Sequence, residues 1–309
     1  MRKAEGSPQP AGGDLGPPSR RPALARWACC LGLGAALAVA PDGLAPPEPA
    51  RAEATRGPCI VCRRPIPWVG KWRTVTLDDQ TWMFHLDDPP PVYCLHCEHP
   101  LADNSPFGPP LRDAAGKVVC RRCAADAVVE ARAAVGLLKR VRAAMTGWGM
   151  TFPWGEIPVR LCSLQALSRL MPEHRGGQLS GVCQVAYTRR LPWGSPRISK
   201  LEIAMLRGLP TLQFEQTLAH ELTHAWMALH GCPRDQAPAF REGACDLAAY
   251  FYLQSLGTPA ATHLKRRLQA NPDPVYGDGL RRHLRFAQVH RVSGVLQQLR
   301  VRKDFPPGW

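Results

Sequence analysis

The sequence lacks an apolar run long enough to cross a membrane near its N-terminus. The run at residues 27–40 covers 14 residues, whereas a membrane-spanning helix needs about 20. A short apolar run that follows Arg20 and Arg21 is typical of an export signal, and Ala-Arg-Ala at 50–52 has the form of a cleavage site. We therefore expect residues 1–52 to be an export signal and linker, and the protein to be periplasmic or secreted. An uncleaved signal would leave a short membrane anchor, the only membrane contact expected.

Acidic residues and aromatics are also scarce. There are 25 Asp and Glu against 39 Lys and Arg, and the net charge is +14. The basic excess continues through residues 261–309 and would suit an anionic partner. This stretch has no nucleic-acid-binding motif and no interleaved aromatics, and arginine is abundant throughout the chain. Nucleic-acid binding is therefore the weaker interpretation, although it remains an alternative. The length of 309 residues and 45% hydrophobic content allow two modest domains.

The chain has twelve cysteines, and half of them form three Cys-x-x-Cys pairs within 65 residues. His85 stands between the first two pairs, and the gaps from Cys62 to His85 and from Cys97 to Cys120 are both 22 residues. A two-residue gap lets both thiolates reach one zinc ion, so repeated pairs indicate structural zinc rather than disulfides. Residues 53–126 contain few apolar side chains and would need such metal sites to fold.

The order of these residues resembles that of a LIM domain, a tandem pair of zinc fingers. The resemblance implies one zinc site of four cysteines, formed by Cys94, Cys97, Cys120 and Cys123. The first site departs from the pattern, because His85 is followed by Leu-Asp-Asp and Asp88 stands where a cysteine is expected. The expected ligands of this first zinc ion are therefore Cys59, Cys62, His85 and Asp88. A LIM-like module also implies a protein partner.

A different metal motif, His-Glu-Leu-Thr-His, occupies residues 220–224. On a helix, His220 and His224 lie on one face and can both point nitrogens at one metal ion. Glu221 would lie beside that ion and could accept a proton from a bound water molecule. The alternative is a helix that happens to carry two histidines. The metal interpretation is favoured because an apolar stripe suited to a core-facing helix avoids both histidines; its members are Leu218, Leu222, Ala225 and Leu229.

A catalytic zinc ion usually has three protein ligands, and Glu242 is the predicted third. It follows His224 by 18 residues, which leaves room for a turn and a second helix. Asp246, one helical turn later, could accept a hydrogen bond from the outer nitrogen of a ligating histidine. In the alternative, Glu242 is only a favourable first-turn glutamate and Asp246 is a solvated neighbour.

Two further features of the sequence allow more than one interpretation. Tyr276, in the sequence Pro-Val-Tyr-Gly-Asp-Gly, could stabilise an oxyanion, or the segment could be a structural loop. Cys245, inside the Glu242 helix, is expected to be a buried apolar residue, and a disulfide with Cys232 is conceivable after export.

About 250 residues of the chain resemble the DA-one family of plant LIM-containing peptidases and their bacterial relatives. The resemblance extends from Cys59 to Pro306 and rests on the LIM-like module, Gly-Leu-Pro before the His220 motif, Glu-Gly at 242–243, and residues 273–283. It implies a zinc-dependent endopeptidase that acts on proteins or peptides. In the plant members a ubiquitin-binding segment precedes the LIM domain. Here the export signal and linker take that place, so activation by ubiquitin is not implied.

The resulting expectation is an α+β protein with one catalytic and two structural zinc ions. It comprises a LIM-like double zinc finger (53–126), a connecting helix (127–146) and a mixed, largely helical metallopeptidase domain of the gluzincin type (147–309). The principal alternative is a non-catalytic zinc-finger scaffold that uses the peptidase fold as a platform.

Overall fold

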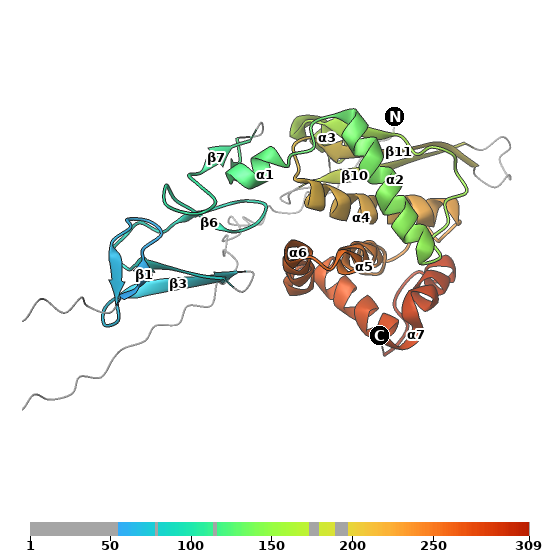
Figure 1. Cartoon of the computed structure of the whole chain (residues 1–309). Coiled ribbons are helices and arrows are strands. Elements are labelled where there is room, and N and C mark those ends of the chain that lie inside the picture. Colours follow the sequence, from blue (N-terminus) through green and yellow to red (C-terminus); the bar gives the residue numbers. More distant parts are fainter. Residues whose placement is uncertain (1–54, 78–79, 114–115, 173–178, 189–196, 309) are drawn as a thin grey trace, which may run out of the picture.

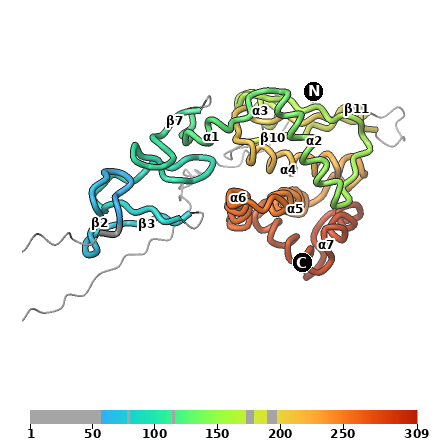
Figure 2. Tube along the Cα trace, viewed as in Figure 1, coloured from blue at the N-terminus to red at the C-terminus, as the bar shows by residue number. Residues whose placement is uncertain are grey.

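The computed structural model describes residues 55–77, 80–113, 116–172, 179–188 and 197–308. The predicted export signal, residues 1–52, lies outside the described residues. The described chain forms a mixed α+β structure with two parts, a finger module (55–126) and a C-terminal domain (131–308) (Figures 1 and 2). No helix in these described ranges has the length and apolar character needed to cross a membrane.

The finger module is built from short antiparallel strand pairs and one short helix. Its elements are β1(Thr55–Pro58) with β2(Pro65–Pro67), β3(Trp72–Leu77) with β4(Gln80–His85), β5(Val92–Tyr93) with β6(Pro100–Leu101), β7(Leu111–Arg112) with β8(Val118–Val119), and α1(Arg121–Ala125). Two small apolar clusters lie around the two groups of predicted zinc ligands, and Phe107 packs against both. Such small cores need additional cross-links to be stable, which fits the predicted need for metal.

The helix α2(Ala131–Gly147) connects the module to the C-terminal domain. Its buried residues Ala134, Leu138, Val141 and Met145 recur at helical spacing and face the main core. The helix begins later than the predicted residue 127, because the preceding segment pairs with another part of the backbone. Val128 exchanges backbone hydrogen bonds with residues 208 and 209, which lead into the next long helix.

A three-stranded sheet forms one layer of the C-terminal domain. Its strands are β9(Val159–Cys162), β10(Gly181–Thr188) and β11(Arg197–Leu206), in the order β10-β11-β9, and α3(Leu164–Leu170) follows β9. The β10–β11 pair is antiparallel and the β11–β9 pair is parallel. Within the described sheet β10 is therefore an edge strand, with β11 as its single neighbour.

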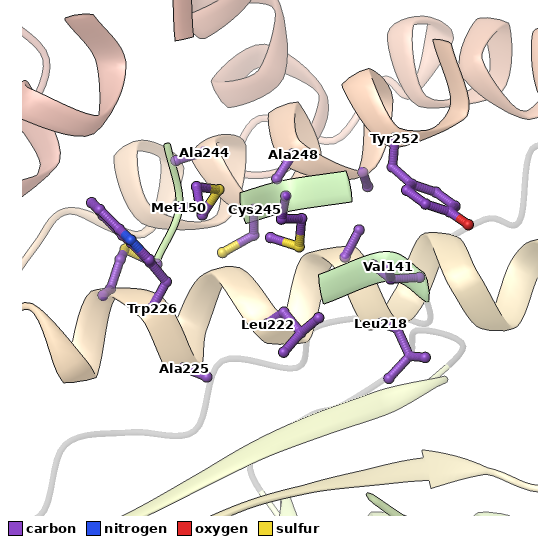
Figure 3. Close-up of a cluster of buried hydrophobic side chains, with 14 of the residues drawn as sticks. Val141, Met150, Leu218, Leu222, Ala225, Trp226, Ala244, Cys245, Ala248 and Tyr252 are labelled. Carbon is purple, nitrogen blue, oxygen red and sulfur yellow. The ribbon is translucent and has the colours of Figure 1, made fainter. Parts of the chain in front are cut away.

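Four helices form the rest of the domain: α4(Thr211–Leu229), α5(Pro238–Leu256), α6(Pro259–Ala270) and α7(Gly277–Val301). The apolar side chains of α4 and α5 meet in the main core (Figure 3). Three of the four predicted stripe residues of α4 are fully buried, and Leu229 is partly buried. Gly231 follows α4 with a φ of 66°, which matches the predicted stop, because this backbone conformation favours glycine.

Helices α5 and α7 cross in direct backbone contact at two glycines. A Cβ atom on Gly243 would lie 2.3 Å from the carbonyl carbon of Gly279, and one on Gly279 would lie 2.3 Å from the carbonyl oxygen of Ala239. Both residues must therefore be glycine for the helices to approach this closely. The crossing joins the Glu-Gly and Gly-Asp-Gly motifs of the sequence, and it fixes Tyr276, the residue before α7, beside α5.

The second finger docks onto the C-terminal domain through the loop between Cys94 and Cys97. The backbone carbonyl of His96, between Cys94 and Cys97, accepts hydrogen bonds from Gln213 Nε2 of α4 at 2.6 Å and Arg267 Nη1 of α6 at 2.7 Å. Glu98 forms an ion pair with Arg267 at 2.9 Å.

The link between the two parts adds a helix cap to this contact. Asp126 directly follows the finger helix α1, and its carboxylate accepts hydrogen bonds from the backbone N–H and the hydroxyl of Thr211. Thr211 is the first residue of α4, whose first turn has unpaired N–H groups that a carboxylate can satisfy. The finger module and the predicted catalytic helix are therefore joined by several specific contacts.

Candidate metal sites

Among the described residues, three clusters of side chains could each hold a metal ion. They bring together all the metal ligands that the sequence predicts, and in each cluster the candidate ligand atoms lie within 4.8 Å of one another. Ideal tetrahedral zinc sites place neighbouring ligand atoms about 3.3 Å apart for N and O, about 3.6 Å for N and S, and about 3.8 Å for two sulfurs, from the usual bond lengths. These separations test how well the donors fit the ion.

The second finger contains the cluster of four cysteines. The Sγ atoms of Cys97 and Cys120 are 3.7 Å apart, close to the sulfur–sulfur edge of a zinc tetrahedron. The backbone N–H of Cys120 donates to Cys94 Sγ and that of Cys123 donates to Cys120 Sγ, both at 3.2 Å. These donors stabilise negative charge on the sulfurs, and the site fits zinc.

In the first finger, Asp88 lies at the fourth ligand position, the one at which the sequence departs from the LIM pattern. Asp88 Oδ2 lies 2.9 Å from Cys59 Sγ and 3.2 Å from His85 Nδ1, and Cys62 Sγ lies 3.3 Å from the same nitrogen. The other ring nitrogen of His85 lies 3.2 Å from the carbonyl oxygen of Pro65, a contact that orients the ring. The hydrogen bond from Cys59 is the main cause that lowers the pKa of Asp88 to about 2, so this ligand is ionised.

The third cluster joins α4 and α5 at His220, His224 and Glu242. Glu242 Oε2 lies 3.3 Å from His220 Nε2 and 3.1 Å from His224 Nε2, close to the nitrogen–oxygen edge of a zinc tetrahedron. Burial opposes ionisation of Glu242, but the two histidines outweigh it and lower its pKa below the usual range. The other carboxylate oxygen, Oε1, accepts a hydrogen bond from Arg241 Nε at 3.0 Å.

Asp246 occupies the supporting position that its spacing predicts. Its Oδ1 atom lies 2.8 Å from His220 Nδ1, which directs the Nε2 atom of the same ring toward Glu242. Burial favours the neutral imidazole, but the hydrogen bonds to Asp246 and Glu242 raise the pKa of His220 above its usual value. A carboxylate behind a ligating histidine orients the ring and makes it a better donor.

The third cluster opens onto a cavity of about 360 Å³. Glu221 lines this cavity directly beside the edge strand β10, because Gly181 allows a close approach. A Cβ atom on Gly181 would lie 2.9 Å from Cγ and 3.1 Å from Oε1 of Glu221. The cavity wall is formed by residues of β10, α4, α5 and the loop between α4 and α5, including Val182, Cys183, Val185, Tyr187, Met227, Cys232, Arg234, Arg241 and Glu242.

Tyr276 lies on the same cavity wall, where its ring stacks on that of His220 with centroids 6.2 Å apart. Burial, followed by the charges of Glu242, Asp246 and Glu221, raises the pKa of Tyr276 to about 12. Its hydroxyl is therefore protonated at neutral pH and can donate a hydrogen bond. The structure thus places Tyr276 at the site and also shows the structural role of the following glycines.

Cys245 is the residue of this cluster that the sequence interpretation missed. It was expected to be an apolar core residue, and it is fully buried, but its Sγ atom belongs to the group of candidate ligand atoms. The conceivable disulfide with Cys232 is not formed, since both cysteines are free. Its spacing of three residues from Glu242, on a helix, was the signal that could have identified it.

Comparison with known proteins places these sites in a family context. Residues 196–266 match the family model described as "DA1-like: Protein DA1". This region contains His220, His224, Glu242 and Cys245. No solved structure matches the chain significantly.

Curated relatives give the same indication over a longer region. The chain is 25% identical over 266 residues to Protein DA1 of Arabidopsis thaliana, and 24% identical over 248 residues to Protein DA1-related 1 of the same plant. It is 27% identical over 194 residues to the LIM domain-containing protein HDR3 of Oryza sativa subsp. japonica. These matches cover 69%, 62% and 55% of this chain, and 49%, 44% and 38% of the relatives, respectively.

These similarities relate the chain to proteins that include a LIM domain-containing protein. They support a relationship to the DA1 family in particular, as the resemblance of the motifs predicts. The chain spans less than half of the length of these curated relatives.

Proposed function

We propose that the chain is a zinc-dependent endopeptidase. The observation that carries this proposal is the meeting of His220, His224 and Glu242 at zinc-like separations on a cavity that Glu221 also lines. A scaffold has no need for a carboxylate beside an open metal site. Catalytic zinc sites combine three such ligands with an accessible position for water.

The proposed mechanism assigns a separate task to each residue. His220, His224 and Glu242 would hold the zinc ion, which supplies Lewis acidity and lowers the pKa of a bound water molecule to about 7. Glu221 would accept the proton of this water and later transfer it to the leaving amine. Tyr276, which stays protonated, would donate a hydrogen bond to the oxyanion that forms on the peptide carbonyl.

The position of the edge strand β10 is evidence that the substrate is a peptide. Residues of β10 line the cavity beside Glu221, and the strand has β11 as its single neighbour in the described sheet. An extended peptide can pair with such an edge through backbone hydrogen bonds. This arrangement would hold a substrate across the metal site with chain on both sides of the cleaved bond, as endopeptidase activity requires. The finger module would bind a protein partner or regulate access.

Replacement of Glu221 by Gln tests this function. The amide cannot accept the water proton, so we expect cleavage to fall by at least about 10²-fold, as for removal of a general base. The metal content should stay unchanged, because Glu221 acts on water and not on the ion. Purified wild-type and variant proteins are incubated with a proteome extract, new peptide termini are identified by mass spectrometry, and zinc per chain is measured.

The matched control is Glu202→Gln, which changes a glutamate on β11 that pairs with Lys200 away from the cavity. This variant should cleave as the wild type does. New termini that appear equally with the Glu221→Gln protein would contradict the assigned role. No cleavage by the zinc-loaded wild type would instead favour the scaffold alternative.

We also propose that the protein is exported and that residues before about 53 are removed. The order of basic residues, short apolar run and small-x-small site supports this. Mass spectrometry of the mature protein should find a new N-terminus near residue 53. An intact N-terminus in the cytoplasmic fraction would contradict export, whereas membrane retention of residues 1–40 would favour an uncleaved anchor.

A further inference from the structure

Cys245 lies on the closed side of the third metal cluster. It follows Glu242 by three residues on α5, so both side chains project from neighbouring positions on one face of the helix. Glu242 lines the cavity, whereas Cys245 points into the core between α5 and α4 and is fully buried (Figure 3). The sulfur therefore lies on the core side of the cluster, away from the cavity wall.

The sulfur lies among the candidate ligand atoms of the metal site. Cys245 Sγ lies 3.5 Å from Nδ1 and 3.6 Å from Nε2 of His224, so it packs against the imidazole ring of a residue whose Nε2 atom also faces Glu242. The candidate ligand atoms of His220, His224, Glu242 and Cys245 all lie within 4.8 Å of one another. Coordination of a shared ion would require the Cys245 side chain to rotate from the face of the His224 ring toward the Nε2 side.

The neighbouring cysteines provide a comparison. Cys183 and Cys232 line the cavity wall, yet neither belongs to the group of candidate ligand atoms. Proximity to the cavity is therefore not what places Cys245 in the cluster. The helical spacing from Glu242 and the distance to His224 distinguish it from these other thiols.

We propose that Cys245 is a fourth protein ligand of the metal ion and that the resting centre is a closed site of two histidines, one glutamate and one thiolate. The thiol releases its proton to solvent as the bond between sulfur and the ion forms. Catalytic water must then displace the sulfur or add as a fifth ligand from the cavity side. This inference rests on the metal site of the proposed function, but it does not require that the protein cleaves peptides.

The fourth ligand has two consequences. A closed set of four protein ligands is typical of structural zinc sites, so the ion is held more tightly than three ligands would hold it. The thiolate also competes with water for the position that catalysis needs. Cys245 would thus restrain the activity of the resting protein.

Cobalt substitution with the variants Cys245→Ala and Cys245→Ser tests the ligand assignment. A thiolate bound to Co²⁺ produces a near-ultraviolet charge-transfer band. Wild-type and variant proteins are loaded to equal metal content, and their spectra are subtracted so that the contributions of the two fingers cancel. We expect a difference band of one cobalt–thiolate bond for both variants, and zinc affinity at this site at least about 10-fold lower in a competition titration.

The matched control is Cys162→Ala, which changes another buried cysteine, in the separate core between α3 and the sheet. It should retain the full wild-type spectrum and affinity. Far-ultraviolet circular dichroism establishes that each variant is folded, and the serine variant preserves the size of the side chain if the alanine variant is unstable. A folded Cys245 variant with the spectrum and zinc affinity of the wild type would overturn the proposal.

The same measurements beside a cleavage assay of the wild-type protein separate this proposal from the proposed function. A Cys245-dependent cobalt–thiolate band in a wild-type protein that cleaves nothing would support the ligand assignment and contradict the peptidase function. Cleavage by the wild type without a Cys245-dependent band would support the peptidase function and overturn the ligand assignment.

Discussion

Glu242→Ala is expected to lower the zinc content from three ions per chain toward two and to abolish peptide cleavage. The variant removes the carboxylate oxygen that lies 3.1–3.3 Å from the two histidine nitrogens. It leaves the candidate ligands of both fingers intact, and closed sites of this kind bind zinc as part of folding. The fold should therefore survive while the third site loses its ion during gel filtration with a weak chelator. Elemental mass spectrometry gives zinc per chain, and a peptide assay gives the cleavage rate.

Glu221→Gln is the informative partner of this variant, because the two glutamates have different assigned tasks. Glu221→Gln should retain three zinc ions and still fail to cleave. If Glu221→Gln lost the metal while Glu242→Ala kept both metal and activity, the assignment of the two glutamates would be wrong. If the wild type held only two ions, Asp88 in the first finger would be the first ligand to reconsider.

Gly243→Ala is expected to destabilise the C-terminal domain by about 3 kcal/mol or more, at the upper end of the range for overpacked cores. The new methyl group would lie 2.3 Å from the carbonyl carbon of Gly279, and backbone cannot rotate away as a flexible side chain can. Helices α5 and α7 would have to separate, which moves Tyr276 from the cavity and should also lower cleavage. The free energy of unfolding is measured by urea denaturation.

Gly136→Ala provides the matched control, since it makes the same substitution inside a helix. Gly136 lies on the exposed face of α2, and a Cβ atom there would meet nothing within 4 Å. Alanine should stabilise this position by about 0.5–1 kcal/mol through its higher helix propensity. An unfolding free energy for Gly243→Ala within about 0.5 kcal/mol of the wild type, the usual range for surface substitutions, would show that the crossing is not close-packed.

The sequence was sufficient to predict those parts of the site whose geometry depends on residues close together in the chain. The spacing of His220 and His224 determines that they share a helix face, and the Cys-x-x-Cys pairs determine their own geometry. Glu242 and Asp246 were identified because one helix could supply a ligand and its support, one turn apart. The structure brings both to the positions that this reasoning predicted.

Features that depend on how distant elements pack could not be predicted in the same way. Nothing local shows that Gly243 faces Gly279, because the crossing angle of two helices depends on the whole core. For the same reason, the contact between Cys245 and His224 of α4 could not be predicted, although the spacing of Cys245 from Glu242 was a local signal. The sequence also gave no sign that β10 would be an edge strand beside Glu221.

The docked second finger makes metal binding and helix formation one thermodynamically linked process. Zinc at Cys94 and Cys97 would fix the loop whose His96 carbonyl accepts from Gln213 and Arg267. The Gln213 contact and the cap that Asp126 provides at Thr211 then stabilise α4 only while that finger is folded. Any ligand that favours the folded finger therefore also favours an ordered α4, and the reverse holds by reciprocity. The loop at His96 is already bound to the C-terminal domain. The first finger is therefore the more accessible surface of the finger module for a protein partner.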